Sequence, residues 1–217
     1  MNNRTTSPFM LAPPMALALA SNFGSVEHFI DDVVTLANAH SATLESARGE
    51  IRLAFDPALG ALRTHWVTRA DATNATDALS PLLTITLPFE PDEIFADLDW
   101  PFAYQRYQDA VHAASERFAA HDTASALVLD VRRAGEFEAA PTMLPGATWR
   151  DPAAVTEWAD HLPVDRPVLV YCACGHEVGR VTAMRLQALG VDARFVVGGI
   201  DAWQRAGRAT VVKPRPT

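Results

Sequence analysis

Strand-like and helix-like segments alternate through the second half of this sequence, and that order constrains the fold more than any other feature. Apolar runs of strand length end at Val131, Tyr171 and Val197. The segments that follow them carry apolar residues at helical spacing. Strands alternating with helices favour a parallel sheet with helices on both faces. We therefore expect an α/β domain over residues 121–217.

One of these strands leads directly into a cysteine. Residues 168–171 are followed by Cys172, a glycine-containing loop and a helical pattern that begins near Val178. Open α/β sheets bind ligands at the carboxyl ends of their strands. Loop amides and a helix N-terminus stabilise negative charge, which would favour the nucleophilic thiolate of Cys172. The loop alone also fits a pair of buried structural cysteines.

The first half of the chain has a different order of elements and predicts a separate α+β domain. Two helices, a hairpin, a third strand and a final helix are expected at 14–22, 25–36, 50–69, 82–87 and 103–119. Two domains of about 100 residues suit a chain of 217. The expected division is a flexible N-terminus at 1–12, an α+β domain with three antiparallel strands at 13–120, and the α/β domain at 121–217.

The charge balance and the cysteine count exclude several classes of function. With 18 basic and 26 acidic residues the net charge is −8, which argues against nucleic-acid or anionic-membrane partners. No apolar run approaches the roughly 20 residues that span a membrane. Two cysteines separated by one residue do not form the disulfide framework typical of a small secreted protein. Prolines at 13 and 14 interrupt the apolar stretch after Arg4, so we expect a cytoplasmic protein, with a secretory signal as the alternative.

Two phrases in the first half of the chain are distinctive, Phe23-Gly24-Ser25-Val26-Glu27-His28-Phe29 and Ser80-Pro81-Leu82-Leu83-Thr84. Through these phrases and the order of elements, residues 13–119 resemble the C-terminal domain of the iron/manganese superoxide dismutases. In that family an Asp-x-Trp-Glu-His-Ala motif supplies two metal ligands, and the aligned segment here is Thr86-Leu87-Pro88-Phe89-Glu90-Pro91. The resemblance therefore implies a scaffold without metal or other cofactor. Glu90, Asp92 and Glu93 fit a solvated acidic loop, and retention of a metal through other residues is the alternative.

Five phrases in the second half of the chain follow one another in register: Leu129-Asp130-Val131-Arg132, Glu136-Phe137, Leu144-Pro145-Gly146-Ala147, Val170-Tyr171-Cys172 with Gly175, and Val196-Val197-Gly198-Gly199-Ile200 with Ala202-Trp203. Through these phrases, residues 122–210 resemble the rhodanese (sulfurtransferase) domain. The family usually has an extra strand and helix before the first phrase. Only residues 119–125 are available for them here, so we expect the long helix before these residues to take the place of that strand and helix.

The rhodanese resemblance implies that Cys172 carries sulfane sulfur as a persulfide. A small-molecule donor would supply the sulfur, and a thiol, cyanide or another protein would accept it. The backbone of the following residues would form the active-site loop: Ala173, Cys174, Gly175, His176, Glu177 and Val178. The same resemblance gives a structural signature of Asp130, Arg132, Glu136, Gly198, Gly199 and Trp203.

Within that signature, local spacing suggests particular contacts. Arg132 and Glu136 are four residues apart at the head of a helix and are interpreted as a stabilising pair. The two glycines and Trp203 are expected to pack on the loop side of the sheet.

The loop departs from the common pattern at two positions. Thiosulfate-using members generally have Arg after the cysteine and Arg or Thr at the last loop position, where this chain has Ala173 and Glu177. A carboxylate at the rim disfavours a dianion, so thiosulfate is a doubtful donor, although Arg180 could contact an anion. Phosphatase relatives need an arginine six positions after the cysteine, where this chain has Val178. Phosphoryl chemistry is therefore excluded.

Two loop side chains leave alternatives open. His176 is either an acid/base group or an exposed polar residue. A disulfide across one intervening residue would be strained, so Cys174 is interpreted as a loop-packing residue. The Gly175-His176-Glu177-Val178 sequence also resembles rhodanese-like proteins encoded beside chromate-resistance genes. The alternative to sulfur transfer is a non-catalytic thiol module that binds or senses sulfur species, metal–thiol complexes or oxyanions, linked to chromate or oxidative stress.

Overall fold

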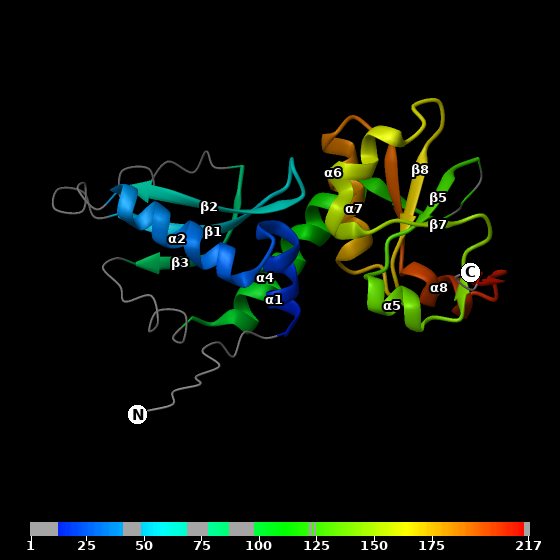
Figure 1. Cartoon of the computed structure of the whole chain (residues 1–217), viewed down its shortest axis with the longest axis horizontal. Helices are drawn as coiled ribbons and strands as arrows, with labels where there is room; N and C mark the ends of the chain where they lie inside the picture. The colour runs from blue at the N-terminus through cyan, green and yellow to red at the C-terminus, as the bar shows by residue number, and fades with distance from the viewer. Residues whose placement is uncertain are drawn as a thin grey trace. The chain divides into compact units, whose positions relative to one another are not determined.

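A computed structural model of the chain describes residues 13–40, 49–68, 78–86, 98–121, 123 and 125–214 (Figure 1). Its internal contacts divide the chain into two compact units. The first contains the described residues up to Asp56 together with 62–107, and the second contains 57–61 and the described residues from Gln108 onward. The N-terminus expected to be flexible, 1–12, lies outside the described residues.

The first unit has the α+β order expected from the sequence. Its elements are α1 (Pro13–Phe23), α2 (Val26–His40), β1 (Gly49–Asp56), β2 (Ala61–Thr68), β3 (Ser80–Thr86) and the beginning of α4 (Trp100–Ser115). The three strands form one sheet in the order β2-β1-β3. Strands β1 and β3 pair antiparallel, with Leu53 opposite Leu83. The expected three-stranded sheet is therefore present.

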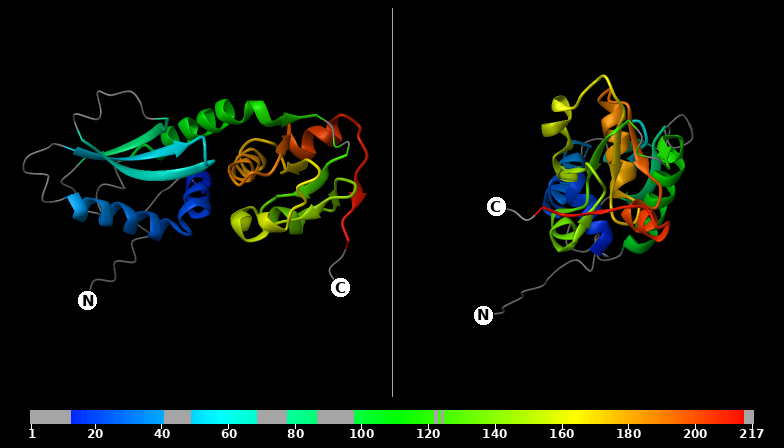
Figure 2. Two further views of the ribbon diagram at one scale, coloured as in Figure 1. Left: turned by 90° about the horizontal axis from the view of Figure 1, so that it is seen from above. Right: turned by 90° about the vertical axis from the view of Figure 1, so that its right-hand side faces the viewer.

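Apolar side chains on two helices and the central strand form the core of this unit. Ser25 begins α2 as a cap, because its Oγ accepts a hydrogen bond from the His28 amide at 3.1 Å. Phe29, buried one turn further along, contacts Trp100 edge to face. Phe55 of β1 meets Tyr107 of α4 in the same geometry. Figure 2 shows α2 lying alongside the sheet that it covers.

The second unit is the α/β domain. Its elements after α4 are η3 (Glu116–Phe118), β4 (Ala119–Ala120), β5 (Leu127–Asp130), α5 (Ala134–Ala139), β6 (Thr142–Met143), β7 (Thr148–Trp149), η4 (Pro152–Ala154), α6 (Val155–Trp158), η5 (Ala159–His161), β8 (Val168–Tyr171), α7 (Val178–Ala188), β9 (Ala193–Val196), α8 (Gly199–Arg205) and β10 (Val211–Val212). Five strands form a parallel sheet in the order β4-β9-β8-β5-β7. Strand β8, which leads to Cys172, is the middle one.

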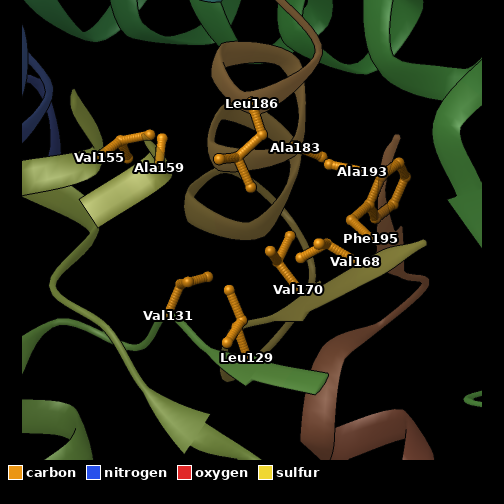
Figure 3. Packing of buried hydrophobic residues seen from close by; sticks show 10 residues of the cluster. All are labelled: Leu129, Val131, Val155, Ala159, Val168, Val170, Ala183, Leu186, Ala193 and Phe195. Carbon is orange, nitrogen blue, oxygen red and sulfur yellow. The ribbon is translucent and has the colours of Figure 1, made fainter. Parts of the chain in front are cut away.

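Alternate residues of β8 face two different cores, as the pleat of a strand requires. Val168 and Val170 pack with Ala183 and Leu186 of α7 in one cluster (Figure 3). Leu169 and Tyr171 belong to the opposite cluster, which includes Ile200 of α8. Helices therefore cover both faces of the sheet, and β8 is buried along its whole length. A fully buried central strand gives its carboxyl end a fixed position.

The segment between the two units differs from the sequence expectation. The helix expected at 103–119 begins at Trp100 and ends at Ser115. Ala119 and Ala120 then form β4, which pairs with β9 at the edge of the parallel sheet. The end of α4, η3 and β4 thus stand where the family usually has its first strand and helix. The second unit includes the end of α4, and the units divide after Tyr107, whereas the boundary expected from the sequence is 120/121.

Two short parts of the second unit were not predicted from the sequence. Between Pro152 and His161 the chain forms η4, α6 and η5 in succession. Asp151 caps the start of η4, because its Oδ1 accepts a hydrogen bond from the Ala153 amide at 2.9 Å. Strand β10, which pairs with β6, had no sequence signal. Both differences involve elements of four residues or fewer, too short for periodicity to reveal.

Several expectations concern residues that lie outside the described part. The segment aligned with the dismutase metal motif is described only at its first residue, Thr86, and Glu90, Asp92 and Glu93 also lie outside. Among the described residues, no group of three or more His, Cys, Asp or Glu side chains could hold a metal ion. Within the same ranges, no helix has both the length and the apolarity that crossing a membrane demands.

Candidate active site

Cys172 lies at the carboxyl end of the middle strand, in the turn between β8 and α7. Its side chain is only 3% exposed. The Gly175 amide donates a hydrogen bond to its Sγ at 3.3 Å, which folds the loop back over the sulfur. Gly175 has φ +70°, and a Cβ there would lie 2.5 Å from the Gly198 nitrogen. Glycine is therefore required at this point of the loop.

The electrostatic environment of Cys172 differs from the sequence expectation. Burial raises the pKa of the thiol to about 11, although hydrogen bonds from the Gly179 and Gly175 amides lower it. The nearby Cys174 and Glu136 side chains raise the pKa further. The loop amides were expected to favour the thiolate, but the loss of solvent around the sulfur outweighs them. The resting form of Cys172 is therefore the thiol.

The first turn of α8 holds the loop by main-chain contacts. The Ile200 and Asp201 amides donate hydrogen bonds of 3.0 Å to the Cys172 and Ala173 carbonyls. Gly199 has φ +59°, and a Cβ there would lie 2.4 Å from both carbonyl oxygens. Gly199 thus lets α8 approach the loop backbone closely. Trp203 packs on the core around Tyr171, and its Nε1 donates to the Ala209 carbonyl at 2.9 Å.

A buried polar network supports the two strands beneath the loop. Tyr171 Oη donates a 2.6 Å hydrogen bond to Asp130 Oδ2. Arg132 Nε donates to Asp130 Oδ1 at 2.9 Å, and both side chains are almost fully buried. Burial and the Asp130 carboxylate raise the pKa of Tyr171, so its hydroxyl remains a donor. Asp130 thus holds both Tyr171 and Arg132 beneath the loop.

The expected Arg132–Glu136 pair is wrong. Arg132 pairs with Asp130, which lies two residues away on the adjoining strand. Glu136 instead accepts a hydrogen bond from the Arg133 amide at 3.3 Å and so caps the start of α5. The spacing of four residues assumed that both side chains sit on one helix, but α5 begins only at Ala134.

Arg180 is buried beside the cysteine loop. Its side chain is 7% exposed, and Nε donates to the Gly175 carbonyl at 3.0 Å. Nη1 donates to Ser115 Oγ at 3.0 Å and lies 3.6 Å from Glu116 Oε2. These contacts tie the loop to the end of α4. The expected anion contact of Arg180 stays a prediction.

The structure brings an additional cation to the loop. Arg133 Nη2 lies 3.3 Å from Glu177 Oε1. The two residues are 44 positions apart, and no local pattern in the sequence links them. Each stands at the N-terminus of a helix, Arg133 before α5 and Glu177 before α7. The carboxylate at the rim of the loop is therefore neutralised by a neighbour that sequence reasoning missed.

Another residue that sequence reasoning missed is His112 of α4. Its ring lies 6.0 Å from the ring of His176, centre to centre, in an edge-to-face arrangement. Burial and the neighbouring Arg180 and His176 lower the pKa of His112. His176 itself is exposed, which leaves both interpretations of it open. Its partner comes from the helix that substitutes for the usual first elements of the domain.

Cys174 does not pack into the loop as expected. It is exposed, whereas Cys172 is buried, and both are free thiols. The carbonyls of the two residues before it, Cys172 and Ala173, accept hydrogen bonds from the first turn of α8. The two cysteines of this chain thus occupy different environments despite their spacing.

Comparisons with known proteins agree with this geometry. Residues 111–206 match the family model described as "Rhodanese-like domain". These residues form a rhodanese-like domain. The match begins within α4, so the family's own boundary includes the helix end and β4 that complete the sheet here. It does not extend over residues 1–110, and the dismutase resemblance of the first unit stays a prediction.

Several solved structures resemble part of the chain. The protein hp1203 from Helicobacter pylori 26695 is 25% identical, with a TM-score of 0.40, and the match covers 46% of this chain and 93% of that one. A rhodanese-related protein from Thermoplasma volcanium is 22% identical, with a TM-score of 0.36 and coverage of 47% and 92%. A thiosulfate sulfurtransferase from Pseudomonas aeruginosa is 24% identical, with a TM-score of 0.36 and coverage of 41% and 16%. Among curated proteins, nothing matches the chain.

Proposed function

We propose that this protein is a sulfurtransferase that carries sulfane sulfur as a persulfide on Cys172. The observation that carries the proposal is the position of that thiol. Cys172 ends the middle strand of a rhodanese-like domain, and its sulfur accepts the Gly175 amide at 3.3 Å. Nucleophiles of open α/β sheets are found at such strand ends. A small-molecule donor supplies the sulfur, and a thiol, cyanide or protein accepts it, in the cytoplasm.

The transfer begins with loss of the Cys172 proton. The thiolate then attacks the transferable sulfur of the donor, and the bond from that sulfur to the rest of the donor, S–S in thiosulfate and C–S in mercaptopyruvate, is replaced by the new bond to Cys172. The donor's remaining group leaves with the electron pair. Amides that lower the pKa of the thiol are placed to stabilise the charged persulfide in the same way, because they donate to the same site.

The alternative is a thiol module that binds or senses sulfur species without transferring sulfur. One observation favours it: Cys172 is almost completely buried and its pKa is raised to about 11. A thiol of this kind reacts slowly near neutral pH. Under this alternative, the exposed Cys174 would make the first contact with an oxidised sulfur compound or a metal–thiol complex.

A donor panel separates the two functions. The full-length protein is incubated with thiosulfate, a thiosulfonate, mercaptopyruvate or polysulfide, and its intact mass is measured. Peptide mapping then locates the added atom. One added sulfur on Cys172, released by cyanide, supports transfer. Failure of the whole panel, together with tight binding of a thiol or oxyanion, supports the binding module.

For the first unit we propose a dismutase-like scaffold that has lost its metal. The proposal is supported by the order of elements in this unit, which is two helices, three strands and a final helix. Metal analysis of the purified protein tests it, because stoichiometric iron or manganese would show that other residues hold a metal.

A further inference from the structure

The Arg133–Glu177 pair lies at the rim of the cysteine loop. Arg133 follows β5 by way of Arg132, and Glu177 ends the loop that follows β8, so the pair joins the ends of two neighbouring parallel strands. The side chains are 29% and 12% exposed. Partial burial makes the interaction of such charges stronger than that of a fully exposed pair.

The other charged groups around the loop are held elsewhere. Arg132 is paired with Asp130, and Arg180 donates to Gly175 and Ser115. Glu136 contributes a second carboxylate, close enough to raise the pKa of Cys172. Of the three arginines near the loop, Arg133 is thus the partly exposed one, and a carboxylate of the loop itself occupies it.

We propose that Glu177, by occupying Arg133, selects sulfur donors that carry at most one negative charge. A dianion meets two carboxylates at the rim and a cation that is already paired. A singly charged donor experiences less of this repulsion. The inference rests on the proposed function of Cys172 and extends it to a class of donor, thiosulfonates and other weakly charged sulfane compounds.

Two donors of closely similar shape differ by one charge and test this selectivity. With thiosulfate, the Cys172 thiolate attacks the sulfane sulfur and sulfite leaves with the electron pair. With methanethiosulfonate, the same bond forms and methanesulfinate leaves. Both reactions give the same persulfide, conserve charge and need no oxidant. The intrinsic reactivities of the two donors cancel when the ratio of loading rates is compared between variants or between salt concentrations, so a change in that ratio reports charge selectivity.

The experiment measures persulfide formation on the full-length protein by intact mass with each donor. We expect wild type to load methanethiosulfonate faster. Glu177→Gln should raise the ratio of thiosulfate to methanethiosulfonate loading about tenfold, because it removes one negative charge and releases Arg133. Arg133→Gln should lower the ratio and Arg133→Lys should preserve it. Glu157→Gln, which removes an exposed carboxylate from α6, is the matched control and should leave the ratio unchanged.

The salt dependence of wild-type loading provides a second test, which does not require any variant to fold. Higher ionic strength should speed thiosulfate loading relative to methanethiosulfonate loading, since salt screens the repulsion. A ratio that is unaffected by both salt and Glu177→Gln overturns this inference while sulfur transfer stands. Failure of wild type to gain sulfur from any donor overturns the proposed function, and the inference with it.

Discussion

Tyr171 Oη and Asp130 Oδ2 form a buried hydrogen bond of 2.6 Å that joins the last residues of β8 and β5. The same hydroxyl accepts the Leu144 amide at 3.1 Å, and the carboxylate holds Arg132. The residue before Cys172 thus joins three segments of the chain. Such a network is costly to interrupt because each of its members is buried.

Replacing Tyr171 by Phe removes this hydroxyl. The Asp130 carboxylate and the Leu144 amide each lose a partner, so we expect the free energy of unfolding to fall by about 1–3 kcal/mol. Urea denaturation of the full-length protein, followed by circular dichroism, measures the change. A loss below about 0.5 kcal/mol, the size expected of an ordinary surface substitution, would contradict a structural role for the bond.

The two cysteines should differ in their effect on sulfur loading. Cys172→Ser removes the nucleophile and should abolish the added sulfur in the intact mass. Cys174→Ser changes an exposed side chain and should retain most of the loading. Equal losses in the two variants would instead make the pair a redox couple.

Gly199→Ala tests the anchoring of the loop on α8. A Cβ would lie 2.4 Å from two carbonyl oxygens at a φ of +59°, so we expect a loss of stability of at least about 2 kcal/mol and slower sulfur loading. Gly135→Ala is the control, because a Cβ there meets nothing within 4 Å and the residue lies inside α5. That substitution should leave stability equal or raise it by about 0.5–1 kcal/mol.

The raised pKa of Cys172 predicts a distinctive pH dependence. Well below a pKa of about 11, the thiolate fraction grows about tenfold per pH unit. Alkylation of Cys172 by iodoacetamide in the Cys174→Ser variant should therefore still be accelerating at pH 9.5, and mass spectrometry can follow it. A rate that levels off near pH 7 would mean that the loop amides dominate after all.

The raised pKa of Cys172 should also make the free energy of unfolding depend on pH. Because the folded state binds the Cys172 proton more tightly than the unfolded state, its contribution is complete below the unfolded pKa of about 8.5. The contribution is lost as the pH rises from there towards 11. Wild type should lose more stability than Cys172→Ala over that interval in urea titrations. Parallel curves for the two proteins would contradict the raised pKa.

The sequence predicted the parallel sheet and the position of Cys172 because those features follow from periodicity and chain order. It could not predict that Arg132 pairs with Asp130, since local spacing says nothing of where a helix begins. It also missed Arg133 beside Glu177 and His112 beside His176, because these partners are distant in sequence and meet only after folding. The burial of Cys172, which reverses the expected protonation state, likewise depends on tertiary packing.

The loop is shaped almost entirely through main-chain atoms. Ile200 and Asp201 bind its carbonyls, Arg180 binds another, and the Gly175 amide binds the sulfur. The side chains at 173, 174 and 176 do not take part in these particular bonds. Substitutions there can therefore accumulate over evolutionary time while the cradle keeps its form. Under the proposed function, such a main-chain scaffold would allow the preferred sulfur donor to change through side-chain substitutions while the backbone around Cys172 keeps its conformation.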